Sequence, residues 1–213
     1  MMDKRTIETV KIFNDAAQGY QDKYMDVSSY AASLVLFCDS LSSQDGDVLD
    51  VACGPGNVAK FIADKRPGTK IMATDLSRKM LDLTKINVPN ACTSLMNAKD
   101  IKTVGQQFDG ILASFIFPYL SKSEVIDFIN DASVIMKKSG VLYISTMQGK
   151  NSNSGYEGPS DGVQMYMNYH EVTYLEKALT DSGFAIVSSI IKPYDYGGDN
   201  NGTDIIIIGK LKA

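Results

Sequence analysis

The sequence lacks several features that would assign it to particular classes of protein. It contains no tryptophan, a single histidine, three cysteines and no apolar run long enough to span a bilayer. The single histidine, His170, excludes a multi-histidine metal centre. The odd number of cysteines, without a Cys-x-x-Cys spacing, argues against a disulfide framework or a zinc site. We therefore expect reduced thiols, no metal cofactor, no membrane segment and a cytoplasmic location.

The charge balance is mildly acidic, because 21 Lys and Arg stand against 25 Asp and Glu for a formal net charge of −4. No segment combines dense Lys and Arg with aromatic side chains, which disfavours a nucleic-acid partner. The 213 residues suffice for one sizeable core. We expect a single domain over residues 1–213, with residues 1–44 forming an N-terminal helical cap.

From residue 47 onward, short apolar runs alternate with amphipathic segments of helical period. One such helix is expected from Ser121 to the Lys137-Lys138-Ser139-Gly140 turn, with Gly140 just past its end. No helix fits between the last two strands, so they should pair antiparallel. The pattern predicts an α/β, doubly wound, seven-stranded, mostly parallel Rossmann-like sheet with an antiparallel C-terminal strand. The expected strands are Asp47–Ala52, Lys70–Thr74, Cys92–Met96, Phe108–Ser114, Val141–Thr146, Phe184–Ile191 and Asp204–Lys210.

A glycine-rich loop follows the first expected strand. The strand carries Asp50 and breaks at Gly54-Pro55-Gly56, after which a helical pattern begins. Glycines let a ligand approach the backbone closely, and a helix N-terminus offers N–H groups to an anionic group. Ligands bind beyond the carboxyl ends of the strands in such sheets, so the loop is a candidate site. Its Gly54-x-Gly56-x-x-Ala59 spacing, with Asp75 after the second strand, also fits a relaxed dinucleotide fingerprint.

Several segments follow one another along the chain in a fixed order: Asp50–Gly56, Ala73–Leu81, Asn97-Ala98, Phe108–Phe115 and Lys137–Thr146, then Gly183-Phe184 and the isoleucine run Ile205–Ile208. Taken together, these segments resemble the class I S-adenosylmethionine-dependent methyltransferases of the small-molecule type. Ala52 stands where that family more often has Gly, and Asn97 where it usually has Asp. The resemblance covers nearly the whole chain. It implies an S-adenosylmethionine cofactor, with S-adenosylhomocysteine as product, and methyl transfer to a small-molecule acceptor.

The resemblance also implies a set of cofactor-binding residues. Asp75 can accept hydrogen bonds from both ribose hydroxyls, or it can cap the helix that begins near Ser77. Gly54 and Gly56 let the backbone reach the methionine end, or they only form a tight turn. Asp50 orients the ammonium end, or it caps the N–H groups of the loop. The implied set is Tyr20, Asp50, Ala52, Gly54, Gly56, Asp75, Leu76, Met80, Asn97, Ala98 and Ser114.

Other members of this set also have structural explanations. Leu76 and Met80 offer apolar surface to an adenine ring, but they could equally belong to the core. Ser114 would lie near the methionine end, or it bonds locally at a strand end. Tyr20 resembles the tyrosine that closes over the cofactor in this family, or it is a surface residue.

The segment Met147–Tyr169 interrupts the alternation of strands and helices. It is rich in Gly, Ser and Asn at first, then in Met and Tyr. A loop of this length is usually functional or mobile, so we expect a substrate lid over residues 147–169. His170 could act as a general base near physiological pH, or stand beside a helix start without chemistry. The expected acceptor-lining residues are Phe117, Tyr119, Tyr156, Met165, Tyr166 and Tyr169.

Three functions therefore remain open. The first is an S-adenosylmethionine-dependent methyltransferase, with a small-molecule acceptor favoured because the stretch Ser114–Tyr119 replaces the Asn/Asp-Pro-Pro-Tyr of amino-methylating enzymes. The second is an NAD(P)-dependent oxidoreductase. The third is a non-catalytic S-adenosylmethionine-binding module, since Ala52 and Asn97 depart from the common pattern.

Overall fold

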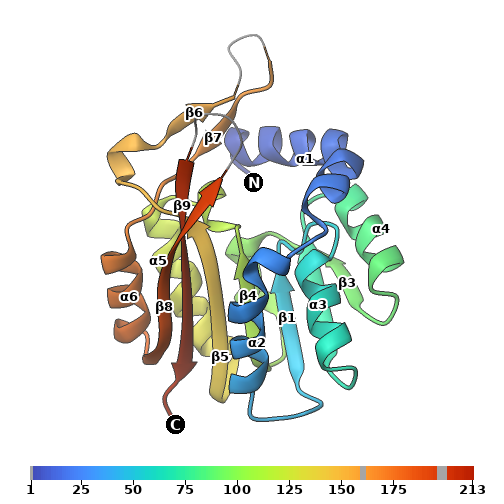
Figure 1. Ribbon diagram of the computed structural model, residues 1–213, viewed down its shortest axis with the longest axis vertical. Helices are drawn as coiled ribbons and strands as arrows, with labels where there is room; N and C mark the ends of the chain where they lie inside the picture. The colour runs from blue at the N-terminus through green and yellow to red at the C-terminus, as the bar shows by residue number, and fades with distance from the viewer. Residues whose placement is uncertain (1, 159–161, 196–200) are drawn as a thin grey trace.

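The computed structural model describes residues 2–158, 162–195 and 201–213. Its main sheet has seven strands in the order β3-β2-β1-β4-β5-β9-β8 (Figure 1). β9 runs antiparallel to both β5 and β8, and the other strands are parallel to one another. This arrangement confirms the predicted doubly wound sheet. The strands are β1 (Asp47–Val51), β2 (Lys70–Asp75), β3 (Cys92–Leu95), β4 (Phe108–Ser114), β5 (Met136–Met147), β8 (Phe184–Asp195) and β9 (Asn201–Leu211).

Helices cover both faces of the sheet, and each face has its own apolar core. α2 (Ala31–Ser40), α3 (Asn57–Lys65) and α4 (Arg78–Asn87) contribute buried residues to one core. α5 (Lys122–Ile135), α6 (Val172–Asp181) and the short helix η2 (Ala98–Val104) contribute to the other. Among the residues that the structure describes, no helix is both long and apolar enough to cross a bilayer.

The isoleucine run of β9 shows why the sheet needs both layers. Ile205 and Ile207 pack into the core beneath α5 and α6, whereas Ile206 and Ile208 pack into the core beneath α2 and α3. All four are buried. Successive strand residues point to opposite faces, so a continuous apolar run is what a strand covered on both sides requires.

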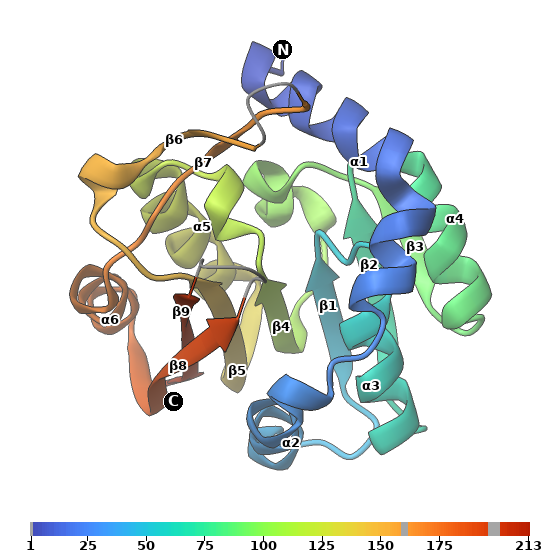
Figure 2. The ribbon, with the colours of Figure 1, turned by 45° about the horizontal axis from the view of Figure 1, so that its top comes forward.

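The two main helices of residues 1–44, the predicted helical cap, lie in different places. α1 (Lys4–Tyr24) lies across the carboxyl edge of the sheet, whereas α2 lies beside α3 on a sheet face (Figure 2). Leu34, Phe37 and Leu41 are buried against the sheet, so α2 belongs to the outer layer of the fold. A short helix, η1 (Ser28–Tyr30), precedes α2, and neither helix has a side chain that caps its N-terminus.

The predicted end of the helix that begins near Ser121 is wrong. α5 ends at Ile135, and Met136 already pairs with β4. The residue with a left-handed conformation is Ser139, with φ 60°, rather than Gly140, and it lies within β5. Lys137 lies at the amino edge of the sheet, where its Nζ is 2.8 Å from carboxylate oxygens of both Asp47 and Asp109. These long-range ion pairs hold the lysine in a strand, where the sequence pattern indicated a helix C-terminus.

Part of the segment 147–169 forms a small hairpin above the sheet. After the helical turn η4 (Asn151–Asn153), β6 (Gly155–Glu157) pairs antiparallel with β7 (Met165–Met167). The hairpin lies near the N-terminal half of α1 in both ribbon views (Figures 1 and 2). The guanidinium of Arg5 stacks 3.8 Å from the centre of the Tyr166 ring. This segment is therefore positioned over the carboxyl edge, and its function as a lid stays a prediction.

Candidate functional site

The loop between β1 and α3 turns through three residues of positive φ. Ala52 has φ 54°, Gly54 has φ 56° and Gly56 has φ 82°. A Cβ added to Gly54 would meet only the Tyr20 ring, at 3.7 Å, so Gly54 borders open space. A Cβ added to Gly56 would lie 3.1 Å from a methyl carbon of Thr84 in α4. Gly56 therefore allows two helices to pack closely, while Gly54 leaves the backbone accessible.

Asp75, the last residue of β2, fastens this loop to the start of α4. Its Oδ2 accepts the backbone N–H of Gly54 at 3.0 Å, and its Oδ1 accepts that of Ser77 at 2.7 Å. Burial raises the pKa of the Asp75 carboxyl to about 6, against the lowering effect of these amides. Ser77 in turn caps α4 by accepting the N–H of Met80. Asp75 thus both organises the helix start and faces the space above the loop.

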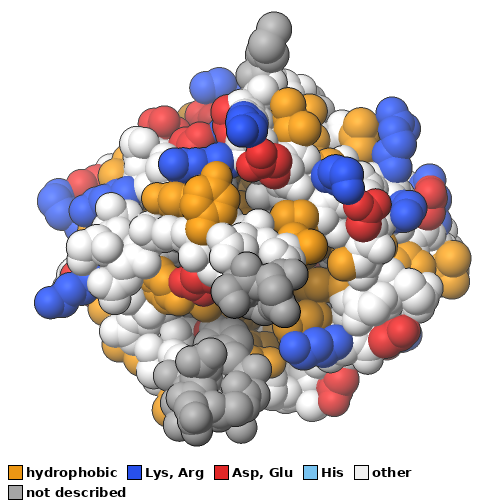
Figure 3. All heavy atoms as spheres, turned by 90° about the horizontal axis from the view of Figure 1, so that it is seen from above, with side chains coloured by type: hydrophobic (Ala, Val, Ile, Leu, Met, Phe, Trp, Pro, Cys, Tyr) orange, Lys and Arg blue, Asp and Glu red, His pale blue; other side chains and the backbone are white. Residues whose placement is uncertain are grey.

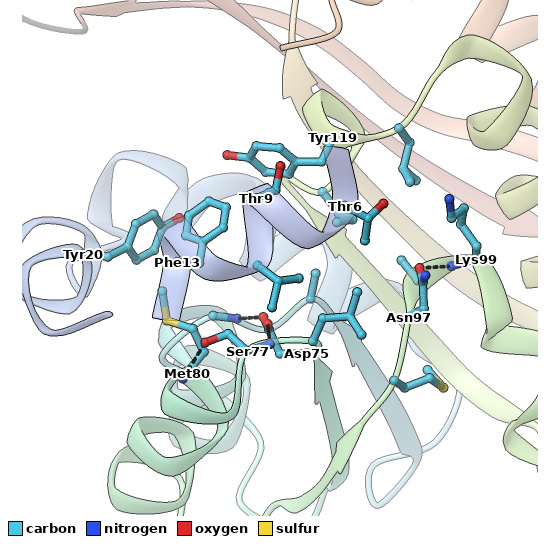
Figure 4. Close-up of a pocket in the computed structure, with 18 residues that line it drawn as sticks. Thr6, Thr9, Phe13, Tyr20, Asp75, Ser77, Met80, Asn97, Lys99 and Tyr119 are labelled. Atoms are coloured by element: carbon cyan, nitrogen blue, oxygen red, sulfur yellow. Dashed lines mark hydrogen bonds between the residues drawn. The ribbon is translucent and has the colours of Figure 1, made fainter. Parts of the chain in front are cut away.

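We call this space the loop cleft. In Figure 4, side chains of α1 lie along one side of it, and Asp75, Ser77 and Met80 lie opposite. The cleft brings together most of the sequence-predicted cofactor residues, but Asp50, Gly56 and Ser114 do not line it. It is lined by Thr6, Thr9, Val10, Phe13, Tyr20, Ala52, Gly54, Asp75, Leu76, Ser77, Met80, Met96, Asn97, Ala98, Lys99, Ile116, Tyr119 and Leu120.

Asp50 lies buried beneath the glycine loop, with 1% of its surface exposed. Its Oδ2 has no hydrogen-bond partner among the described residues. Burial, together with the negative charge of Asp75, raises the pKa of the Asp50 carboxyl to about 8. A buried acceptor without a partner is costly for a folded protein. Its position under a ligand-accessible loop suits a site that receives a positively charged group.

Asn97 has a second, local function that the sequence did not indicate. Its side-chain oxygen accepts the N–H of Lys99 at 3.0 Å and so caps η2. Its amide group also borders the loop cleft, as Figure 4 shows. The residue can therefore position this part of the cleft wall and still offer polar atoms to a ligand.

A second cavity, of about 460 Å³, adjoins the loop cleft. Phe13, Tyr20 and Tyr119 line both, and Phe13 packs edge-on against the other two rings, with centroids 5.6 and 5.3 Å away. We call it the tyrosine cavity. Its lining residues are Ile12, Phe13, Ala16, Tyr20, Lys23, Tyr24, Asp26, Val27, Ser29, Tyr30, Leu34, Asn57, Val58, Ser114, Phe115, Pro118, Tyr119, Tyr143, Met147, Met165, Met167 and Tyr194.

The residues expected to line an acceptor pocket fall into separate places. Tyr119 and Met165 line the tyrosine cavity. Phe117 is fully buried in the core, where its ring packs against Phe128. Tyr166 borders a neighbouring hollow together with Arg5. Neither Tyr156, which is 56% exposed, nor Tyr169 lines the tyrosine cavity.

His170 is fully buried, and both of its ring nitrogens are engaged. Nε2 lies 2.8 Å from the carbonyl oxygen of Phe117, and Nδ1 is bonded to the hydroxyl of Tyr174. Because the carbonyl can only accept, Nε2 carries the hydrogen and Nδ1 accepts from Tyr174. Burial lowers the pKa of His170 and keeps the ring neutral. This placement favours the interpretation of His170 as a residue without chemistry.

Sequence reasoning identified Tyr20 and Ser114 but missed most of the other residues of α1 and of the strand ends that line the two cavities. Thr9 and Phe13 follow an ordinary helical pattern, and Tyr143 lies within an apolar strand. One signal was available, since the chain has 11 tyrosines and several stand in segments that reach the carboxyl edge. Figure 3, which looks onto that edge, shows hydrophobic side chains near its centre with charged groups around them.

Comparison with known proteins agrees with this geometry. Residues 48–140 match the family model described as a methyltransferase domain. The malonyl-(acyl-carrier protein) O-methyltransferase of Acetivibrio thermocellus is 28% identical over 152 residues, which make up 68% of this chain and 50% of that protein. The chain spans about half the length of the curated relatives that it matches first.

Solved structures of similar fold cover the whole chain. The 1,6-didemethyltoxoflavin-N1-methyltransferase of Burkholderia thailandensis has a TM-score of 0.75 at 14% identity, covering 100% of this chain and 92% of that one. The magnesium protoporphyrin IX methyltransferase of Synechocystis has a TM-score of 0.73 at 16% identity, covering 100% and 99%. Residues 48–140 therefore match a methyltransferase domain, and the solved structures show that the whole chain shares the fold of S-adenosylmethionine-dependent methyltransferases.

Proposed function

We propose that the protein binds S-adenosylmethionine in the loop cleft and transfers its methyl group to a small molecule held in the tyrosine cavity. The observation that carries this proposal is the position of Asp75. Its carboxylate borders the cleft at the end of β2 and is held there by the amides of Gly54 and Ser77. Strand ends at the switch point of a doubly wound sheet are where such folds bind nucleoside ligands.

The residues present fit the cofactor in three respects. Each Asp75 oxygen keeps acceptor capacity beyond its amide bond, so the carboxylate can receive the two ribose hydroxyls. The unpartnered oxygen of Asp50 beneath the loop can help to orient the ammonium end, through water or backbone groups. Leu76 and Met80 give the cleft an apolar wall suited to an adenine ring.

The cofactor supplies a methyl group on a sulfonium, which is already an excellent leaving group. The protein therefore has mainly to hold the acceptor close and in line, and such positioning is worth roughly 7–11 kcal/mol. The shared rings of Phe13, Tyr20 and Tyr119 fit this task, because they border both cavities. The apolar lining of the tyrosine cavity also limits access of water to the reacting groups.

A small-molecule acceptor agrees with the names of two solved structures of similar fold. One of them is a complex with 1,6-didemethyltoxoflavin and S-adenosylhomocysteine, and the other is a magnesium protoporphyrin IX methyltransferase. The net charge of −4 supports a protein without a nucleic-acid partner. The three cysteines, which are all free, support a cytoplasmic location.

Turnover separates the methyltransferase from a non-catalytic module. The protein is incubated with S-adenosylmethionine and a library of small phenols, carboxylic acids and ring N–H compounds, and formation of S-adenosylhomocysteine is measured. We expect acceptor-dependent product that Asp75→Asn lowers at least tenfold. Asp82→Asn serves as the control, because Asp82 is an exposed carboxylate of α4 that pairs with Lys85. Cofactor binding without product for any acceptor would support the non-catalytic module.

A further inference from the structure

Tyr30 and Asp204 form a hydrogen-bonded pair at the base of the tyrosine cavity. The Tyr30 hydroxyl donates to Asp204 Oδ2 at 2.7 Å, although 174 positions separate the two residues. Tyr30 lines the cavity, whereas Asp204 is fully buried near the start of β9, opposite Met147 of β5. The carboxylate therefore meets the cavity through the tyrosine hydroxyl.

Further polar groups lie near this pair, on the same face of the sheet. The hydroxyl of Tyr143 lies 3.1 Å from Ser33 Oγ, and Ser114 Oγ lies 3.1 Å from Ser145 Oγ. Burial raises the pKa of Tyr143 to about 12, and the negative charge of Asp204 acts in the same direction. The base of the cavity thus has a line of hydroxyl groups with one buried carboxylate behind it.

The walls around the pair are flat and apolar. The Phe115 ring packs edge-on against Tyr30, with ring centroids 5.5 Å apart. The Tyr194 ring stacks on Tyr30, with centroids 6.3 Å apart and an angle of 16° between the ring planes. The thioethers of Met147, Met165 and Met167 complete the lining. Phe115 has φ 54°, a strained conformation for an aromatic residue, and strain of this kind concentrates at functional sites. Rings and thioethers pack well on the faces of a planar molecule.

The charged groups near the pair do not form an anion site. Lys192 Nζ lies 4.5 Å from the centre of the Tyr30 ring and donates to the carbonyl oxygen of Ser29. Lys23 and Asp26 are the charged residues among those that line the cavity, and they carry opposite signs. This balance favours a neutral ligand over a carboxylate or phosphate.

We propose that the methyl acceptor is a neutral, planar aromatic or heteroaromatic ring that bears an O–H or N–H group, and that Tyr30, backed by Asp204, receives its proton. This inference rests on the proposed function. A tyrosine hydroxyl that donates its hydrogen still has lone pairs with which to accept one. The ring's O–H or N–H donates to Tyr30 Oη, which in turn holds its own hydrogen toward Asp204.

The proton and electron balance closes without another reactant. The acceptor oxygen or nitrogen uses its lone pair to form the bond to the methyl carbon, and the carbon–sulfur bonding pair stays on sulfur. The acceptor's proton passes to Tyr30 Oη as the Tyr30 proton passes to Asp204. The products are the methylated ring, S-adenosylhomocysteine and a protonated Asp204. Asp204 acts through Tyr30 and is a positioning residue, whereas Tyr30 touches the acceptor.

Two phenols of different acidity test this relay. Wild-type protein, Tyr30→Phe and Asp204→Asn are assayed for methyl transfer from S-adenosylmethionine to 4-methylphenol and to 4-nitrophenol at slightly alkaline pH. 4-Methylphenol must lose its proton during the reaction, whereas 4-nitrophenol is already largely ionised. General-base help is worth about 100-fold or more. We expect Tyr30→Phe to lower kcat about 100-fold for 4-methylphenol and less than about threefold for 4-nitrophenol. Asp204→Asn should likewise lower kcat more for 4-methylphenol than for 4-nitrophenol.

Tyr156→Phe is the matched control, because Tyr156 is exposed on β6 and does not line the cavity. Calorimetry with S-adenosylhomocysteine shows whether each variant keeps its cofactor site. An equal loss for both phenols would overturn the relay. Wild-type protein that binds S-adenosylhomocysteine but methylates neither phenol nor the N–H ring benzimidazole would overturn the acceptor class. If the wild-type protein does not bind S-adenosylhomocysteine, the proposed function itself is contradicted.

Discussion

The carboxylate of Asp75 accepts the backbone N–H of Gly54 at 3.0 Å, and so joins the end of β2 to the glycine loop that follows β1. The bond crosses between two neighbouring strands of the sheet, whose carboxyl ends meet at the loop cleft. One residue therefore fixes the shape of the loop and presents an acceptor to a ligand. The predictions below depend on this double function and on the buried groups around it.

Cofactor affinity should fall as the pH drops through about 6. Burial raises the pKa of Asp75 to about 6, and hydrogen bonds from ribose hydroxyls favour the ionised carboxylate. Protonation below that pH therefore opposes binding, by up to about tenfold per pH unit. Calorimetric titration with S-adenosylhomocysteine across this range measures the slope. Asp75→Asn should bind S-adenosylhomocysteine weakly, with an affinity that depends less on pH. A wild-type affinity that stays constant from pH 5 to 7, on both sides of the Asp75 pKa of about 6, would contradict the account.

Replacing Ala52 by glycine should stabilise the fold. Ala52 has φ 54°, and a left-handed conformation costs an alanine roughly 1–2 kcal/mol, part of which is offset by the greater freedom of glycine in the unfolded chain. We expect the free energy of unfolding to rise by up to about 1 kcal/mol in urea denaturation. The control is Ala63→Gly within α3, which should lower it by roughly 1 kcal/mol. If Ala52→Gly lost as much stability as the control, the conclusion that Ala52 is strained would be contradicted.

Asp50 should make the protein less stable as the pH rises. Its carboxyl has a pKa of about 8 in the folded protein against an ordinary value of 3.8, so the folded state holds a proton that the unfolded chain has released. Stability therefore declines as the pH increases between those two values. Asp50→Asn removes this contribution. Over the same pH range, the free energy of unfolding of the variant should rise by more than about 1 kcal/mol relative to that of the wild type. Asp64→Asn, at an exposed ion pair of α3, is the control. Parallel pH profiles for Asp50→Asn and wild type would refute the prediction.

His170 should matter for stability and not for cofactor binding. His170→Ala leaves the carbonyl of Phe117 and the hydroxyl of Tyr174 without their buried partner, at a cost of about 1–3 kcal/mol. Urea denaturation measures the loss, and the affinity for S-adenosylhomocysteine should stay within about twofold. If the variant kept full stability and its cofactor affinity but lost turnover, His170 would be the general base after all.

The sheet and the cleft could be predicted from the sequence because their signals are local. The apolar runs, the glycines at the loop and the acid after the second strand each lie within a few residues of what they determine. Asp75 and Gly54 meet because parallel strands end at the same edge, which follows from the alternation of strands and helices.

The acceptor side could not be predicted in the same way. In the stretch Ser114–Tyr119, alternation alone cannot tell which ring faces a cavity, and the positive φ of Phe115 decides it. As a result Phe115 lines the tyrosine cavity, while Phe117 is buried in the core. His170 contacts Phe117 and Lys137 contacts Asp109, and both partners are far away in the sequence. The positions of His170 and Lys137 therefore follow from tertiary packing.

Titration with S-adenosylhomocysteine and, separately, with NADH tests the central claim most directly. Wild-type protein, Asp75→Asn and the exposed control Asp82→Asn are compared by calorimetry. The account predicts micromolar binding of S-adenosylhomocysteine that weakens about 10- to 100-fold in Asp75→Asn only, as expected for loss of charged hydrogen bonds, with no NADH signal. Binding of NADH without S-adenosylhomocysteine would contradict it and assign the loop cleft to a dinucleotide.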